Sequence, residues 1–138
     1  MTKAQLKKYR DLCVERNQLL DMLTRLESVL YGPRPVNLDG MPHGAAVDTG
    51  RREVQIARHD ELKRRYELKV IELEAEIDAI ESAIDSLPAK HRTLCRLYYI
   101  EGRTWAQVCE RMNYSWSQVH RIHGEALQRL KEVEYAEN

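Results

Sequence analysis

The sequence of 138 residues contains no phenylalanine and only four prolines, six glycines and three cysteines. Because proline and glycine interrupt helices, their scarcity beside 32% charged residues favours long solvated helices over sheets. The cysteines, Cys13, Cys95 and Cys109, are odd in number and share no close spacing. That pattern argues against a disulfide framework and favours reduced thiols in an intracellular protein.

The sequence also lacks the segments that direct a chain to a membrane. No apolar run approaches the roughly 20 residues of a membrane span, and the first residues, MTKAQLKKYRD, do not form the apolar core of a signal peptide. We therefore expect a cytoplasmic protein. Its 22 basic and 22 acidic residues cancel, so any attraction for nucleic acid must come from a local concentration of charge.

Motifs of enzyme chemistry are missing as well. The sequence contains no glycine-rich phosphate loop and no recognisable pairing of a nucleophile with a base. Cys109, His120 and His123 could be imagined as metal ligands, but their spacing matches no familiar zinc site. We expect no catalytic residue, no cofactor and no metal, and we do not expect an enzyme.

Two long helices are predicted in the first 87 residues. Residues 3–30 contain neither proline nor glycine, and Tyr9, Leu12, Leu19, Leu23, Leu26 and Leu30 form an apolar seam interrupted by Arg16. Residues 51–87 carry a cleaner seam, formed by Tyr66, Val70, Leu73, Ile77, Ile80, Ile84 and Leu87. Steps of four and three over three heptads indicate coiled-coil-like packing. Pro88 ends the second helix, and residues 31–50, rich in proline and glycine, form a loop.

Charge suggests how these two helices meet. The first helix begins with Lys3, Lys7, Lys8 and Arg10, whereas residues 72–85 of the second carry six acidic residues and no basic one. Antiparallel packing, within one chain or between two, would bring the two groups together. Exposed pairs contribute only about 0–1 kcal/mol each, so they would select an orientation more than stabilise it. A solvated acidic face without further meaning is the alternative.

Residues 88–130 predict three further helices. Pro88 suits the first position of a helix that places Leu94, Cys95, Tyr99 and Ile100 in the core and stops at Gly102. Two capping boxes follow, Thr104-x-x-Gln107 and Ser115-x-x-Gln118. They predict a short helix with Trp105, Val108, Cys109 and Met112 inward, a turn at Asn113, and a final helix. Its buried stripe would be Val119, Ile122, Ala126, Leu127 and Leu130. This is the plan of a helix-turn-helix.

The stretch LPAKHRTLCRLYYIEGRTWAQVCERMNYSWSQVHRIHGEALQRL resembles region 4 of sigma-70-type factors, which reads the promoter −35 element. The LP start, the Y-x-EG turn, the capped short helix, the small residue at Cys109 and the closing AL-x-x-L carry the resemblance. The whole chain, with its MPHG loop and RIHGEAL sequence, is similar to phage regulators of the ArpU/RinA type. That resemblance implies an activator of late phage genes for packaging and morphogenesis, working with the host RNA polymerase.

The resemblance also implies which residues meet DNA. Base-reading positions fall on Trp116, Ser117 and Arg121, and positions that touch flanking phosphates fall on Gln118 and His120. Arg103 and Thr104 match backbone contacts, and Ser115 caps the helix whose N–H groups would face phosphate. Sigma factors usually carry charged residues where this chain has Trp116 and Ser117, so the −35 consensus need not be the target.

Physical arguments support some of these roles. The Arg121 guanidinium can read a guanine edge through two hydrogen bonds, and residues 88–131 hold eight basic against three acidic residues. Trp105 is expected at the core or its edge, and His123 is expected either to be solvated or to be packed. Gly124 costs about 1 kcal/mol within a helix, which suggests close approach of a neighbour.

The sequence therefore predicts an all-α protein, a long coiled-coil-like hairpin followed by a sigma region 4-like helix-turn-helix. We expect an oligomerisation region over 1–87, a DNA-binding domain over 88–132 and a frayed tail over 133–138. The leading function is a dimeric or larger regulator that binds double-stranded DNA, with the acidic second helix as a docking surface for polymerase. One alternative is a small terminase subunit, although its DNA module usually comes first; another is a polymerase-binding protein that does not read DNA.

Overall fold

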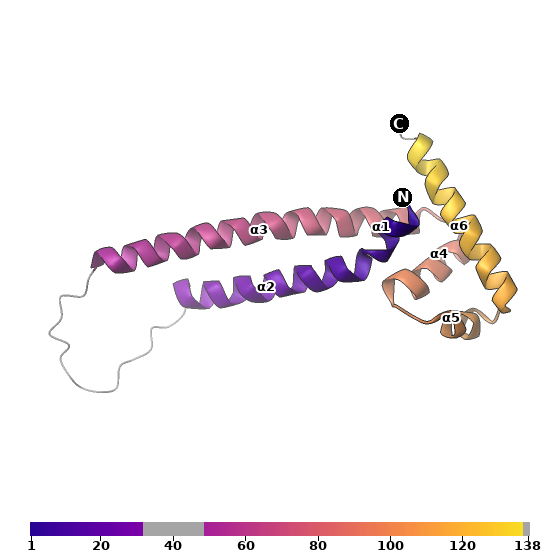
Figure 1. Ribbon diagram of the computed structural model, residues 1–138, viewed down its shortest axis with the longest axis horizontal. Helices are drawn as coiled ribbons and strands as arrows, with labels where there is room; N and C mark the ends of the chain where they lie inside the picture. Colours follow the sequence, from indigo (N-terminus) through magenta and orange to yellow (C-terminus); the bar gives the residue numbers. More distant parts are fainter. Residues whose placement is uncertain (32–48, 137–138) are drawn as a thin grey trace. The chain divides into compact units, whose positions relative to one another are not determined.

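The computed structural model describes residues 1–31 and 49–136, and within these ranges every regular element is a helix. The elements in chain order are α1 (Lys3–Lys7), α2 (Tyr9–Tyr31), α3 (Thr49–Asp85), α4 (Ala89–Cys95), the π-helix η1 (Arg96–Ile100), α5 (Trp105–Met112) and α6 (Trp116–Ala136) (Figure 1). The predicted all-α class is confirmed. Most of the loop expected over 31–50 lies outside the described residues. No helix in the described ranges is long and apolar enough to cross a membrane.

The chain forms two compact units. The first contains Met1–Glu15 together with the chain from Leu73 onward, and the second contains Arg16–Glu72. The first unit thus takes residues from both sides of the domain boundary expected at residue 87. That division into functional domains stays a prediction.

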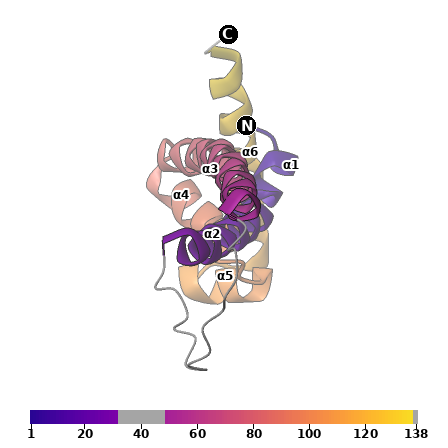
Figure 2. The same ribbon diagram turned by 90° about the vertical axis from the view of Figure 1, so that its left-hand side faces the viewer.

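The second unit consists of a segment of α2 packed along a segment of α3. The two helices run in opposite directions, side by side in both views (Figures 1 and 2). Leu19, Leu23 and Val70 are buried between them. The ammonium of Lys63 lies 4.0 Å from the Glu27 carboxylate and 5.1 Å from the centre of the Tyr31 ring. The antiparallel hairpin therefore closes within one chain.

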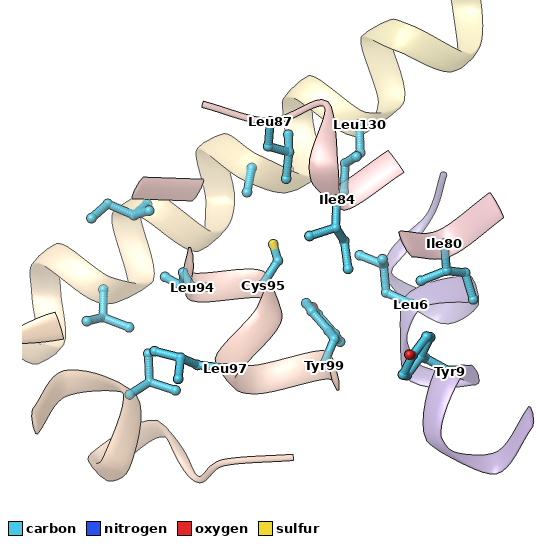
Figure 3. Close-up of a cluster of buried hydrophobic side chains, with 14 of the residues drawn as sticks. Leu6, Tyr9, Ile80, Ile84, Leu87, Leu94, Cys95, Leu97, Tyr99 and Leu130 are labelled. Atoms are coloured by element: carbon cyan, nitrogen blue, oxygen red, sulfur yellow. The ribbon is translucent and has the colours of Figure 1, made fainter. Parts of the chain in front are cut away.

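The core of the first unit joins five parts of the sequence: the start of the chain, the end of α3, α4 with η1, α5 and α6 (Figure 3). Its members are Leu6, Tyr9, Ile77, Ile80, Ile84, Leu87, Leu94, Cys95, Leu97, Tyr99, Val108, Val119, Ile122, Ala126 and Leu130. The seam predicted for the second long helix is confirmed, since all its members from Val70 to Leu87 are buried and Tyr66 is partly buried. The α3 seam therefore continues directly into the core of the helix-turn-helix.

The single helix expected over residues 3–30 is wrong, because the chain breaks at Lys8. Thr2 and Gln5 form a third capping box at the start of α1. Leu6 and Tyr9, on either side of the break, are both buried in the core. The Tyr9 hydroxyl donates a hydrogen bond to the Glu81 carboxylate of α3.

Within the described residues, the basic start of the chain forms no ion pair with the acidic stretch of α3, although the two lie near each other at one groove. Lys8 lines a groove together with Glu76. Lys7 and Arg10 instead line a groove formed by the helix-turn-helix residues before α5. Because the start of the chain lies between α3 and the helix-turn-helix, its two faces meet different neighbours.

The helix after Pro88 also differs from its expected form. Pro88 is the N-cap rather than the first helical residue, and α4 gives way to the π-helix η1. The Glu101 N–H donates to the Arg96 carbonyl, a span of five residues. This wider turn buries Leu97 and Tyr99 and packs Tyr98 against the same core.

The expected tail over 133–138 is helical as far as it is described, because α6 continues to Ala136. Residues 137 and 138 lie outside the described residues. The last helix of the helix-turn-helix therefore has 21 residues and includes most of the segment that was expected to be frayed.

The packing of α1 predicts a test of this core. Leu6 is fully buried, so Leu6→Ala should lower the free energy of unfolding by about 2–5 kcal/mol. The change should appear in denaturant unfolding followed by the fluorescence of Trp105 and Trp116, both of which belong to the first unit. Val14→Ala, at a 57% exposed position of the same unit, is the control. Equal effects of the two substitutions would contradict the docking of α1.

Candidate nucleic-acid interface

The short helix α5 begins and ends as its sequence predicts. The Gln107 N–H donates to the Thr104 hydroxyl at 3.2 Å, and the Thr104 N–H donates to the Gln107 side chain at 3.0 Å. At the other end Asn113 adopts a left-handed conformation with φ of 57°. Asparagine tolerates this region better than residues other than glycine, so it can stop the helix and start a tight turn.

The final helix α6 begins after a second capping box. The Gln118 N–H donates to the Ser115 hydroxyl at 3.3 Å, and the Ser115 N–H donates to the Gln118 amide oxygen at 2.9 Å. The buried stripe of α6 is confirmed: Val119, Ile122, Ala126 and Leu130 are buried, and Leu127 is partly buried. The two capping boxes therefore set the two helices of a helix-turn-helix.

A row of rings connects η1 to the start of α6. Tyr98 stacks on Trp105 with ring centres 3.9 Å apart, the His120 ring lies 4.7 Å from Trp105, and Trp116 lies 4.5 Å from His120. Trp105 packs against the core as expected. The row ends at Trp116, which is 57% exposed. The packing of three inner rings thus holds an exposed indole at the start of α6.

His123 lies behind this row, in the interior. Its Nε2 is 2.6 Å from the Tyr99 hydroxyl, with which it shares a hydrogen bond, and its ring lies 4.8 Å from Trp105. Burial lowers the pKa of His123 to about 4, helped by the charges of Lys3, His120 and Lys7. Burial raises the pKa of Tyr99. Both partners are neutral at physiological pH, as a packed polar pair requires.

The outer side of α6 presents the residues predicted to read bases. Trp116, Ser117 and Arg121 are all exposed, and 70% of the Arg121 side chain is accessible. Gly124 is exposed one turn further along, and a Cβ placed there would meet nothing within 4 Å. The close neighbour expected at Gly124 is therefore not part of the described chain. Together these positions form an exposed face of α6, and the space beside Gly124 is open.

Sequence reasoning missed a polar chain that reaches Arg121 from α4. Buried His91 lies 3.0 Å from one Glu125 oxygen, and the other Glu125 oxygen lies 4.0 Å from the Arg121 guanidinium. The spacing of Arg121 and Glu125 is an i,i+4 pair and could have been found. His91 is 34 residues from Glu125 in the sequence, and no local sequence pattern predicts the contact between them.

The positions expected to touch phosphate are placed unequally. Arg103 precedes α5, with its guanidinium 3.8 Å from Glu101 and its side chain 33% exposed. Thr104 is exposed at the N-cap. Gln118 is exposed, but its amide oxygen is held by Ser115. His120 is partly buried and its Nε2 is buried without a partner, so a phosphate contact through this atom would require the ring to move.

The cysteines and histidines of this region do not gather. Cys95 is fully buried, and burial raises the pKa of its thiol to about 12, which leaves it unreactive at neutral pH. Within residues 1–31 and 49–136 no three histidine, cysteine, aspartate or glutamate side chains are arranged to hold a metal ion.

A family comparison agrees with this geometry. Residues 83–132 match the family described as Sigma-70, region 4, a DNA-binding helix-turn-helix domain. The match spans about a third of the chain, from the last three residues of α3 into α6. Neither the curated proteins nor the solved structures contain a match to the chain. The last third of the protein is thus similar to a DNA-binding module that has no enzymatic role.

The lowered pKa of His123 predicts a pH dependence of stability. In the unfolded chain this histidine binds a proton near pH 6.5, but in the folded protein only near pH 4. The contribution of this neutral histidine to the free energy of unfolding is therefore fully present above pH 6.5. It is lost as the pH drops towards 4, and the loss is at most about 3 kcal/mol. Unfolding in denaturant at several pH values should show this loss.

His123→Phe is the comparison for that measurement, because it keeps a ring but cannot titrate. Its absolute stability will differ, so the slope against pH is the quantity to compare. The variant should lose much of the slope between pH 6.5 and 4. An unchanged slope would show that other groups cause the dependence.

Proposed function

We propose that this protein is a sequence-specific DNA-binding transcriptional regulator whose recognition helix is α6. The observation that carries the proposal is the exposed start of α6, where Trp116, Ser117 and Arg121 project from a helix-turn-helix similar to Sigma-70 region 4. A helix of this kind enters the major groove with its first turns against base edges.

Base reading rests mainly on Arg121. Its guanidinium can donate two hydrogen bonds to a guanine edge, a contact that discriminates by about 1–3 kcal/mol. Glu125 lies beside it and can limit the directions in which the guanidinium points. Trp116, held by the row of rings, suits contact with a thymine methyl or a sugar edge.

Phosphate contacts would position the recognition helix. Arg103 and Thr104 at the start of α5, with Ser115 and Gln118 at the start of α6, lie at the two helix N-termini where backbone N–H groups attract anions. His120 would join them only after its ring has turned. These contacts fix the register on DNA but carry no sequence information.

The regulator we propose activates late phage genes, such as those for packaging and morphogenesis, together with the host RNA polymerase in the bacterial cytoplasm. The resemblance of the whole chain to ArpU/RinA-type regulators supports this role. Glu81 is not a free docking residue for polymerase, since it accepts a hydrogen bond from Tyr9. Glu74 and Glu76 remain exposed on the acidic stretch.

A test of base reading is selection of binding sites from random duplex DNA. The wild type should enrich one motif, and Arg121→Ala should relax the preference at one position and weaken binding by about 1–3 kcal/mol. Arg129→Ala is the matched control, because it removes the same side chain from an exposed position two turns further along α6. It should leave the motif intact.

Either of two results would count against this function. If no motif is enriched by the wild type, sequence-specific reading is excluded and polymerase binding without DNA reading becomes the better hypothesis. If Arg121→Ala and Arg129→Ala have the same effect on the selected motif and on affinity, α6 does not read the DNA sequence through Arg121.

We also propose that the second unit joins two copies of the chain. Leu68 and Ile71, three residues apart on α3, are 63% and 62% exposed, and contiguous exposed apolar side chains often mark protein interfaces. Light scattering should give twice the chain mass of 16.2 kDa. A single-chain mass would remove the dimer, and a ring of many copies would favour the small terminase subunit instead.

A further inference from the structure

Two basic residues at the start of the chain lie against the helix-turn-helix. Lys7 and Arg10 line an open groove with Tyr98, Tyr99, Gly102 and Arg103. The Arg10 guanidinium lies so close to Gly102 that a Cβ there would come within 2.2 Å of its Nη1. Lys3 and Lys7 lie near enough to His123 for their charges to lower its pKa. The position of α1 and the first turns of α2 thus brings cations to the edge of α5.

These cations have no acidic partner in the described part of the chain. No carboxylate lies within 4.0 Å of the charged nitrogen atoms of Lys3, Lys7 or Arg10. All three residues are exposed. His123 stays neutral beside them, so it neither adds to their charge nor neutralises it. Unpaired cations held close together repel one another, and that repulsion is relieved when a polyanion binds.

The cluster continues the surface proposed to meet DNA. Arg103 is shared, because it lines the groove with Lys7 and Arg10 and also precedes Thr104 at the start of α5. If the backbone of a duplex passed the start of α5, its phosphates would follow one another at intervals of a few ångströms along the edge that holds Lys7, Arg10 and Arg103. Glu101 is acidic and lies at this edge, with its carboxylate 3.8 Å from the Arg103 guanidinium.

We propose that Lys7 and Arg10 form a second phosphate-binding site for the backbone of double-stranded DNA, outside the region that is similar to Sigma-70 region 4. This inference rests on the proposed function and adds a partner surface to it. The N-terminal segment extends the footprint of the helix-turn-helix along one strand. It contributes affinity but no base preference, because phosphates are the same at every sequence.

The test is the salt dependence of binding to the selected duplex, measured for the wild type, Lys7→Gln, Arg10→Gln and the double variant. Each lost phosphate contact should reduce the slope of log K against log salt by about 0.9, which weakens binding roughly 8-fold at 0.1 M salt for one contact and roughly 60-fold for two. The curves should converge near 1 M salt. The selected motif should not change.

Lys8→Gln is the matched control, because it removes the same charge from the residue next to Lys7. Lys8 lines a different groove, with Leu12, Glu76 and Ile80, so its loss should leave the slope unchanged. Thermal unfolding of each variant shows that the fold is kept. These positions are exposed, and their midpoints should lie close to that of the wild type.

Three results would overturn the inference. An unchanged slope in the double variant, with Arg121→Ala still relaxing the motif, would remove the second site and leave the proposed function intact. An equal loss in Lys8→Gln would show that only total charge matters. A wild type that binds no duplex would remove the proposed function and the second site together.

Discussion

The first unit depends on burying the end of α3 and the start of the chain against the helix-turn-helix. Helices of seven, five and eight residues, such as α4, η1 and α5, are too short to be stable alone in water. They persist because Ile84, Leu94 and Val108 are fully buried in one cluster with Leu6. The surface proposed to read DNA is built on such short elements, so it requires packing from the start of the chain, more than 70 residues away in the sequence.

Neighbouring side chains also support the exposed face that is proposed to read bases. Side chains that project from the start of α6 cannot be held by burial, so neighbours must hold them from one side. The rings of Trp105 and His120 support Trp116, and Glu125 with His91 supports Arg121. Each exposed group then loses less conformational freedom when it binds, which raises affinity without any additional contact.

The features that could be predicted from the sequence are those determined by residues close together in the chain. The capping boxes that begin at Thr104 and Ser115 each span only four residues, and the apolar seam of α3 repeats in each heptad. Both could therefore be predicted correctly. The break at Lys8 could not be foreseen in the same way, because it follows from contacts with distant parts of the core. The contact between His91 and Glu125 escaped prediction for that reason, and the wide turn of η1 carries no signal that we recognised. The Thr2–Gln5 capping box was visible and was missed.

A chain with no net charge can still attract DNA, because Coulomb interactions in physiological salt fade over about 8 Å. What matters is the charge within that distance of the surface proposed to meet DNA. Residues 88–131 already carry five more basic than acidic residues, and folding brings Lys7 and Arg10 to the same edge as Arg103. Much of the compensating acid lies on α3, where Glu81 accepts a hydrogen bond from Tyr9 and Glu76 lines a groove with Lys8. Because successive side chains on a helix point in different directions, Lys7 and Lys8 line different grooves, and the charges at the start of the chain are divided between them.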